Sequence, residues 1–430
     1  MGWEWLESST NGIIIVMEIG KIDNETLERL VLGRTGASRD EVIVGPGIGE
    51  DCAVLDFGEY ECVLSTDPIT AGASRVGTLA VHISCNDVAA NGVEPLAIML
   101  TVLLPPSVTE EEVEEIARQA DEAAKEIGVQ IIGGHTEVTD AVTQPVISAV
   151  AIGKAPRSGQ RGSEATKLRI QSDGFGALDF DSVRDENSPR FVGREKDNSG
   201  EIRRSLTESS GPPKSSQRLL AAQDGSTPSS ALESARLGSM LPVSGDLIIV
   251  TKKLALEGTA LAAEQCGKEL KPFLTDDEIA RARAMIDRIS VVKEGVIAGR
   301  AGVKAMHDVT EGGVLGAVWE VCTRAGAGAE IEAGALPFDE VTMTICIVLG
   351  LDPMRLISSG SMLMCASTKQ WETLNKKLSE AGIEASVIGR VTEKSGGITL
   401  IMKNGEREAV GPPGPDEIYK IPGPDGIYKI

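Results

Sequence analysis

Regular hydrophobic patterning stops near Arg157 and resumes only near Leu241, and this interruption divides the 430-residue chain into two patterned parts. Single hydrophobic cores rarely grow past about 250 to 300 residues, so a chain of this length is expected to hold two. The interrupting stretch is rich in Ser, Gly, Arg, Asp and Glu, a composition that buries too little apolar surface to offset the entropy of ordering. We therefore predict folded domains at 17–156 and 243–410, separated by an insertion or linker at 157–242.

Two shorter segments flank these domains. Residues 1–16 precede a second methionine, Met17, and are interpreted as an N-terminal extension. Residues 411–430 form a tail in which "PGPDEIYKI" is followed at once by the near-duplicate "PGPDGIYKI". Because chain ends are commonly poorly ordered, the near-duplicate is predicted to add a disordered end rather than a structural repeat.

Strand-like and helix-like segments alternate in both domains, a pattern typical of the α/β or α+β class. In the first domain, Thr109 and Glu112 have the spacing of a capping box, and the apolar stripe that follows ends at Gly128. A strand is predicted at 129–132, leading into "GGHTEVTD". In the second domain, a capping box at Thr275 opens a long helical stretch toward residue 298, with Gly299 as its stop.

Charge and hydropathy exclude several classes of partner. The formal net charge of -22 argues against nucleic acid, whose binding requires a basic face. The apolar run at 13–17 is far too short to cross a bilayer, so no membrane association is expected. The seven cysteines are widely spread without a Cys-x-x-Cys pair, which indicates reduced thiols in a cytoplasmic protein. Cys52 and Cys85 are interpreted as packing residues rather than nucleophiles.

Four short acidic motifs in the first domain could form a metal site. Their candidate ligands are Asp51, Asp67, Asp87 and Glu137, and most follow an apolar run or a glycine turn. If these carboxylates converge, their repulsion requires protons or a cation, and oxygen-only ligands favour Mg²⁺. The alternative is that each carboxylate is an ordinary turn or cap residue.

Glycines accompany two of these motifs and could let backbone amides approach phosphate oxygens. Gly49 precedes Asp51, and Gly133 and Gly134 precede His135, although a tight turn explains such glycines equally well. Phosphate-loop and protein-kinase signatures are absent from the sequence, so any ATP site has another architecture. Only three histidines occur, at 82, 135 and 307. Each is either a structural residue or a catalytic or ligand residue, and three are too few for a typical two-metal phosphoesterase.

The motifs, taken in order, resemble the successive blocks of the aminoimidazole ribonucleotide synthetase superfamily. They are "GEDCAVLD", "STDPIT", "NDVAANGVEPLAIMLTVLLP", "GGHTEVT", "GDLIIVT", "LEGTALAA", "HDVTEGGVLGAVWEV", "LPF" and "GLDPMRLISSGSMLM". Within the superfamily the chain is most similar to the hydrogenase expression/formation (maturation factor) branch. The resemblance implies a two-domain α/β fold with a dimerising, ATP-binding N-terminal domain. It also implies that Mg²⁺-ATP phosphorylates an amide, carbonyl or similar oxygen and so makes it a leaving group.

The same resemblance assigns roles to individual positions. It implies that Asp51 and Asp67 bind the metal, that Asp87 is another acidic position at the nucleotide, and that Glu137 or His135 contacts the metal or a phosphate. Together with the acidic and glycine motifs, this gives metal candidates at Asp51, Asp67, Asp87 and Glu137, nucleotide-binding candidates at Gly49, Asp87, Gly133, Gly134, Thr136, Gly312 and Gly313, and catalytic candidates at His135, Asp308 and Thr310. The loop containing Asp308 and Thr310 is expected to close over the phosphates. Electrostatics and positioning would then supply most of the catalysis.

Several departures from the family pattern leave alternatives open. Hydrogenase maturation enzymes that make a cyano group carry their substrate on a C-terminal cysteine, whereas the last cysteine here is Cys365. The reactive N-terminal loop of selenophosphate synthetases is also not visible. The leading hypothesis is an ATP-dependent, dehydrating or ligase-like enzyme whose acceptor is a separate molecule. The alternatives are a small-molecule kinase of the thiamine monophosphate kinase type and a non-catalytic, nucleotide-binding maturation scaffold.

Overall fold

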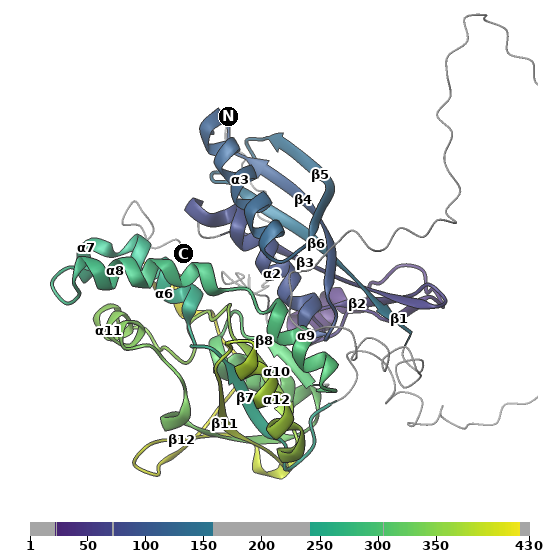
Figure 1. The fold of residues 1–430 in the computed structure, drawn as a ribbon, viewed down its shortest axis with the longest axis vertical. Helices are drawn as coiled ribbons and strands as arrows, with labels where there is room; N and C mark the ends of the chain where they lie inside the picture. Colours follow the sequence, from purple (N-terminus) through teal and green to yellow (C-terminus); the bar gives the residue numbers. More distant parts are fainter. Residues whose placement is uncertain (1–21, 23, 71–72, 158–240, 304, 422–430) are drawn as a thin grey trace, which may run out of the picture. The chain divides into compact units, whose positions relative to one another are not determined.

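Two β-sheets, one in each half of the chain, form the framework of the protein (Figure 1). A computed structural model describes residues 22, 24–70, 73–157, 241–303 and 305–421. The expected extension at 1–16, nearly all of the expected insertion at 157–242 and the second tail copy at 422–430 lie outside the described residues. The predicted two-domain mixed helix and sheet architecture is confirmed.

The N-terminal sheet has six strands in the order β1-β2-β3-β6-β4-β5. Neighbouring strands pair antiparallel except β4 and β5, which are parallel. Helices α2 and α3 pack against one another, and α2 contacts the central strands β3, β6 and β4 (Figure 1). The elements are α1 (Asn24–Leu27), a π-helix (Glu28–Leu32), β1 (Val42–Val44), β2 (Ala53–Asp56), β3 (Tyr60–Ile69), a 3-10 turn (Ala73–Arg75), α2 (Val76–Ala90), β4 (Pro95–Leu104), α3 (Glu110–Glu126), β5 (Gln130–Val138) and β6 (Val146–Pro156).

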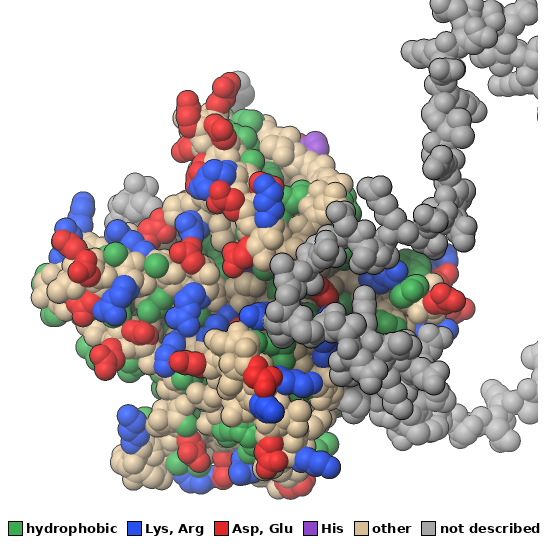
Figure 2. Space-filling model, viewed as in Figure 1, with side chains coloured by type: hydrophobic (Ala, Val, Ile, Leu, Met, Phe, Trp, Pro, Cys, Tyr) green, Lys and Arg blue, Asp and Glu red, His purple; other side chains and the backbone are tan. Residues whose placement is uncertain are grey.

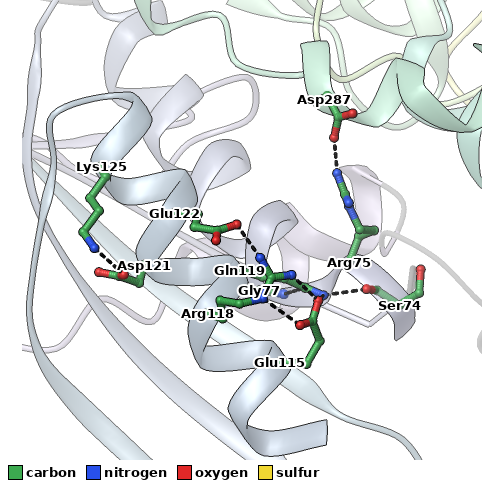
Figure 3. Close-up of polar contacts among 10 residues, drawn as sticks. All are labelled: Ser74, Arg75, Gly77, Glu115, Arg118, Gln119, Asp121, Glu122, Lys125 and Asp287. Atoms are coloured by element: carbon green, nitrogen blue, oxygen red, sulfur yellow. Dashed lines mark hydrogen bonds and ion pairs between the residues drawn. The ribbon is translucent and has the colours of Figure 1, made fainter. Parts of the chain in front are cut away.

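Helix α3 begins where its sequence predicts. The Thr109 hydroxyl accepts a hydrogen bond from the Glu112 amide, and the Glu112 carboxylate accepts one from the Thr109 amide, which completes the expected capping box. Gln119 connects α3 to the start of α2 through two hydrogen bonds. Its side chain donates one of 2.7 Å to the Ser74 carbonyl and accepts one of 3.2 Å from the Gly77 amide (Figure 3). A single buried polar side chain on the α2-facing side of α3 therefore helps to orient the two helices.

Strand β5 begins at Gln130 rather than at 129, and it continues through the glycines instead of turning at them. Gly133 and Gly134 have φ values of +152° and +147°. A Cβ atom on Gly134 would lie 1.8 Å from the Leu100 carbonyl oxygen of β4. Close approach between two parallel strands is therefore a sufficient reason for glycine here.

The C-terminal sheet has seven strands in the order β13-β12-β9-β11-β7-β10-β8, with only the β9–β12 pair parallel. Its strands are β7 (Leu247–Thr251), β8 (Ala305–Asp308), β9 (Gly328–Glu332), β10 (Met362–Ala366), β11 (Ala385–Thr392), β12 (Ile398–Ile401) and β13 (Arg407–Ala409). The α-helices are α6 (Leu256–Gln265), α7 (Gly267–Leu270), α8 (Asp276–Arg283), α9 (Val292–Arg300), α10 (Gly313–Arg324), α11 (Glu340–Leu349) and α12 (Thr368–Glu380). Short 3-10 turns lie at Ala284–Arg288, Ala333–Ala335, Lys394–Gly396 and Glu417–Lys420.

The long helix expected from Thr275 to residue 298 is interrupted in the structure. Its capping box is present, but α8 gives way to a 3-10 turn and α9 starts only at Val292. The side chain of Asn86, from α2, fills the break: it donates to the Ile289 carbonyl at 2.9 Å and accepts from the Val291 amide at 2.8 Å. A tertiary partner thus satisfies the backbone groups that a continuous helix would have paired.

The two domains share packed surfaces. Helix α2 contacts α9 and β8, and Arg75 pairs with Asp287 across the junction (Figure 3). Gly299, the expected helix stop, instead lies inside α9, where a Cβ atom would sit 2.6 Å from the Gly92 Cα. One buried cluster also combines the N-terminal core with apolar residues of the second domain, namely Leu256, Ala260, Met285, Ile286, Ile289 and Val292. The junction is therefore part of the hydrophobic core.

The first copy of the tail repeat packs on the C-terminal domain, whereas the near-duplicate, for which a disordered end is expected, lies outside the described residues. Asp416 and Ile421 are 3% and 5% exposed. Ile421 joins a buried cluster with residues of α6, α8 and α11. Buried polar and apolar anchors together hold this segment in place.

The described residues also show how charged side chains and cysteines are distributed. None of their helices is long and apolar enough to span a membrane. Acidic and basic side chains are interspersed on the face drawn in Figure 2. All seven cysteines are free thiols, and every one except Cys62 is buried.

Candidate functional site

Four carboxylates meet where the two domains join. Asp51 follows the glycine turn before β2, Asp67 lies in β3, Asp87 is in the last turn of α2, and Asp308 ends β8. Asp51, Asp67 and Asp308 all act electrostatically on Asp87, and Asp51 and Asp67 act on Asp308. The predicted convergence therefore holds for Asp51, Asp67 and Asp87, and the second domain adds Asp308.

Strand alternation and helix position explain how the N-terminal acids meet. Ser65, Asp67 and Ile69 alternate along β3 and so point to the same face of the sheet, the face of Asp87. The Ser65 hydroxyl donates a hydrogen bond of 2.5 Å to Asp87, which is 5% exposed. Asp67 interacts with the same carboxyl group. Ser65 thereby orients Asp87 toward the other acids.

Burial and mutual repulsion perturb two of these acids strongly. Burial raises the pKa of Asp87 well above its ordinary value, and the charges of Asp308, Asp67 and Asp51 raise it further. Burial and Asp51 raise the pKa of Asp308 to about 7, although His307 acts in the opposite direction. Among the described residues, no donor makes a hydrogen bond of ordinary geometry to either carboxyl oxygen of Asp308, although Asp87 interacts with this carboxyl group and the His307 Nδ1 lies 3.9 Å from it. The cluster is therefore electrostatically incomplete without a cation or bound protons.

His307 belongs to this cluster although it was left undecided by the sequence. Its Nδ1 donates to the Asp308 carbonyl at 2.6 Å, and its Nε2 lies 3.1 Å from Glu320 and 3.8 Å from Asp51. Burial lowers the pKa of His307, but Asp51, Glu320 and Asp308 together raise it to about 10. His307 is thus a buried cation that partly balances the acids. By contrast, burial lowers the pKa of His82 to about 4, which fits its structural interpretation.

Helix α10 holds the glycine turn that carries Asp51. Arg324 donates to the Gly49 carbonyl at 3.2 Å and pairs with Glu50 at 2.5 Å. A cavity of ≈ 30 Å³ beside this turn is lined by Asp51, His307 and Arg324, among others, and has room for a water molecule or an ion. The sequence signal for Glu320 and Arg324 was slight: two charged residues four positions apart in an otherwise apolar helix.

The donor set fits a hard divalent cation. Asp87 interacts with Asp51, Asp67 and Asp308, and ligand atoms of Asp51, His307 and Asp308 lie within 4.8 Å of each other. His307 has its Nδ1 on a backbone carbonyl and its Nε2 beside Glu320, which leaves the aspartates as the available ligands. Such oxygen ligands suit Mg²⁺, and the lack of an ordinary hydrogen bond to the Asp308 oxygens among the described residues is an independent reason to expect it.

The predicted phosphate loop at Thr310–Gly313 connects Asp308 to α10. Gly312 and Gly313 have φ values of +80° and +61°, and a Cβ atom on Gly313 would lie 2.6 Å from the Met354 carbonyl oxygen. The Thr310 carbonyl accepts hydrogen bonds from the Gly313 and Ser358 amides. The Gly312 amide already donates to Asp416 at 2.7 Å. The loop therefore follows Asp308 of the aspartate cluster directly in the sequence. Its Gly312 amide is not available to a phosphate while it donates a hydrogen bond to Asp416 of the tail.

The remaining predicted site residues lie elsewhere on the N-terminal sheet. Gly133, Gly134, His135, Thr136 and Glu137 are in β5, and His135 and Glu137 are exposed and 3.1 Å apart. Asp67 of β3 pairs with Ala149 of β6, which pairs with Leu100 of β4, which pairs with Gly134 of β5. Three strand spacings, about 14 Å, therefore separate Asp67 from the site residues of β5. Within one chain the structure does not bring Glu137 to the other acids. The first four of these residues instead border an apolar cavity beside α3.

Comparison with known proteins places both domains in one family. Residues 49–155 match the N-terminal domain model of AIR synthase related proteins, and residues 243–401 match the C-terminal domain model, together more than half of the chain. A protein of Methanocaldococcus jannaschii, provisionally assigned to hydrogenase expression and formation, is 24% identical over 92% of this chain and 95% of its own length. The carbamoyl dehydratase HypE of Rhizobium leguminosarum is 22% identical over 80% of this chain and 77% of its own. A crystal structure of the hydrogenase maturation protein HypE in complex with ATP superposes with a TM-score of 0.54 at 16% identity, covering 94% and 98% of the two chains.

Proposed function

Because the chain belongs to the AIR synthase related family, we propose that it is a hydrogenase maturation factor-like enzyme that uses Mg²⁺-ATP to phosphorylate an amide or carbonyl oxygen. The convergence of Asp51, Asp67, Asp87 and Asp308, with no ordinary hydrogen bond to the Asp308 oxygens among the described residues, is the observation that carries this proposal. The carbamoyl dehydratase relatives and the ATP complex of a HypE structure support the reaction class and the nucleotide.

The four aspartates would hold Mg²⁺, which neutralises charge on the transferred phosphoryl group. His307 stays protonated between Asp51 and Glu320 and limits repulsion before the nucleotide binds. Ser65 fixes the rotamer of Asp87, and Arg324 fixes the turn before Asp51. These residues position charge in advance, which is the main catalytic requirement of phosphoryl transfer.

The proposed reaction converts a poor leaving group into a good one. The acceptor oxygen attacks the γ-phosphorus of ATP, the bond to ADP breaks, and the oxygen later departs as phosphate. For a primary amide, loss of phosphate and of the two nitrogen-bound protons leaves a nitrile, so the net change is a dehydration coupled to ATP hydrolysis. The dehydrating and ligase-like forms of this chemistry share the first step.

We propose that the acceptor is a separate small molecule or another protein. Cys365 is 5% exposed within β10, and burial raises its pKa well above the ordinary value, so this thiol is unsuited to carry a substrate. The docked residues 413–421 contain no cysteine. The free thiols, most of them buried, fit a cytoplasmic location.

We also propose a homodimer formed through β5. Every residue of this edge strand is exposed, and Ile131, Ile132 and Val138 are among its exposed apolar side chains. Edge strands with apolar side chains pair readily with another chain. In such a dimer, His135 and Glu137 of one protomer could lie close to the aspartate cluster of its partner.

Product analysis tests the proposed activity. The protein is incubated with Mg²⁺-ATP and candidate acceptors, carbamoyl compounds first, and followed by ³¹P nuclear magnetic resonance. Acceptor-dependent release of free phosphate is expected, together with loss of water from the acceptor. A stable phosphorylated product would instead identify a small-molecule kinase. Nucleotide binding without turnover for any acceptor would favour the non-catalytic scaffold.

A further inference from the structure

The tail contains two copies of one nonapeptide, and only one of them is described by the structure. Residues 413–421 and 422–430 differ at a single position, where Glu417 is replaced by Gly426. The contacts of the first copy therefore show which features of the repeat are needed for docking. They can be compared with the second copy residue by residue.

Asp416 is the polar anchor of the docked copy. It is 3% exposed and accepts hydrogen bonds from the amides of Gly312 at 2.7 Å, Ile357 at 3.1 Å and Ile418 at 2.8 Å. Two of these donors belong to the C-terminal domain rather than to the tail. The second copy carries the same carboxylate at Asp425.

Three further side chains anchor the docked copy. Ile421 is 5% exposed in a cluster with α6, α8 and α11, and Ile418 packs against that cluster. The Tyr419 hydroxyl donates to Glu311 at 3.1 Å. All three anchors recur in the second copy, as Ile430, Ile427 and Tyr428.

The differing position contributes to the first copy alone. Glu417, 7% exposed, accepts a hydrogen bond of 3.0 Å from the Asp352 amide and pairs with Lys420 at 2.6 Å. Gly426 can provide neither contact. The first copy is therefore the preferred occupant, while the second retains the remaining anchors.

We propose that the surface formed by Glu311–Gly312, Asp352–Ile357 and the apolar side chains of α6, α8 and α11 that contact Ile421 is a binding site for the repeated motif, and that residues 422–430 can bind it in place of residues 413–421. When the first copy is docked, residues 411–412 connect Val410 to Pro413. When the second copy replaces it, residues 411–421 connect Val410 to Pro422. The entropy cost of a longer loop grows only logarithmically, so this slip is permitted. Either copy would cap the Gly312 amide beside Asp308.

Hydrogen exchange with mass spectrometry tests this proposal on the full chain. The amide of Gly312 reports docking locally, so the readout does not depend on global stability or on ATP turnover. In Asp416→Ala, protection of the 310–316 peptide is expected to fall by less than tenfold, because the second copy replaces the first. The double variant Asp416→Ala/Asp425→Ala keeps the full tail length but has neither carboxylate. Its protection of the 310–316 peptide is expected to be at least tenfold lower than that of the single variant.

Two results would overturn the proposal. One is equal loss of protection in the single and the double variant. The other concerns a variant in which residues 413–421 are deleted, so that the second copy follows directly after Pro412. If protection of the 310–316 peptide in this variant is as low as in a chain lacking 413–430, the second copy cannot dock. We expect protection of the 310–316 peptide to be close to that of the wild type in this deletion variant. We also expect it to be unchanged in Asp425→Ala alone.

Discussion

Asp67 offers a direct test of the metal site at the level of a single side chain. Asp67→Asn removes one charge from the acidic cluster while preserving side-chain volume on β3. We expect Mg²⁺-ATP affinity to fall roughly tenfold or more, about 1.4 kcal/mol, with the fold intact. Calorimetric titration with and without Mg²⁺ measures this. Asp121→Asn, on the exposed side of α3, is the matched control, and an affinity unchanged in both variants would remove Asp67 from the site.

Glu257 should make stability depend on pH. Burial raises its pKa to about 7, with Ser359 lowering it and Asp416 and Glu311 raising it. The folded state therefore binds a proton more tightly than the unfolded chain, so this contribution to stability falls as pH rises from about 4.5 to 7 and is constant above. Glu257→Gln should raise the free energy of unfolding at pH 8 by up to roughly 3 kcal/mol and by less at pH 5. Urea denaturation at both pH values tests this, with the exposed Glu264→Gln as control.

Asn86 connects α2 to the break between the 3-10 turn and α9. Asn86→Ala would leave the Ile289 carbonyl and the Val291 amide buried without partners, at a cost of roughly 2 to 4 kcal/mol. Asn91→Ala removes one weaker bond of 3.2 Å from the same helix end and should cost less than 1 kcal/mol. Chemical denaturation compares the two variants. Equal losses would mean that the break is held by packing instead.

Strand β5 is the element on which the proposed dimer depends. Ile132→Lys places a charge on a face that dimerisation would bury, so the variant should be monomeric when the wild type is dimeric. Light scattering after size-exclusion chromatography gives the mass of each. Phe57→Lys, on the exposed turn between β2 and β3, should leave the dimer unchanged. A dimer that survives Ile132→Lys must use another surface.

Excision of residues 158–240 tests the organisation of the whole molecule. On either side of this segment the sheets are already paired: β6 with β3 and β4, and β7 with β10 and β11. A chain in which a short Gly-Ser linker joins Arg157 to Leu241 should therefore keep its circular dichroism spectrum and its Mg²⁺-ATP affinity. Collapse of both domains on excision would show that the segment is a folded module.

Local signals predicted much of the fold and part of the site. The Thr109 and Thr275 capping boxes are confirmed because they depend only on neighbouring residues. The break at residues 289–291 was missed because its partner, Asn86, lies about two hundred positions earlier. Likewise, strand order separates Glu137 from Asp67, and no local pattern reveals which strands become neighbours.

The shared core also has a consequence for synthesis of the protein on the ribosome. The buried cluster of the N-terminal sheet includes Leu256, Met285, Ile289 and Val292, which are made long after β6. At ordinary translation rates the delay is on the order of ten seconds or more. During that interval the nascent first domain presents an uncovered apolar surface beside Asp51, Asp67 and Asp87, whose charges are not yet balanced by His307. We therefore expect the apolar surface of the nascent chain to be exposed to aggregation until α9 has emerged.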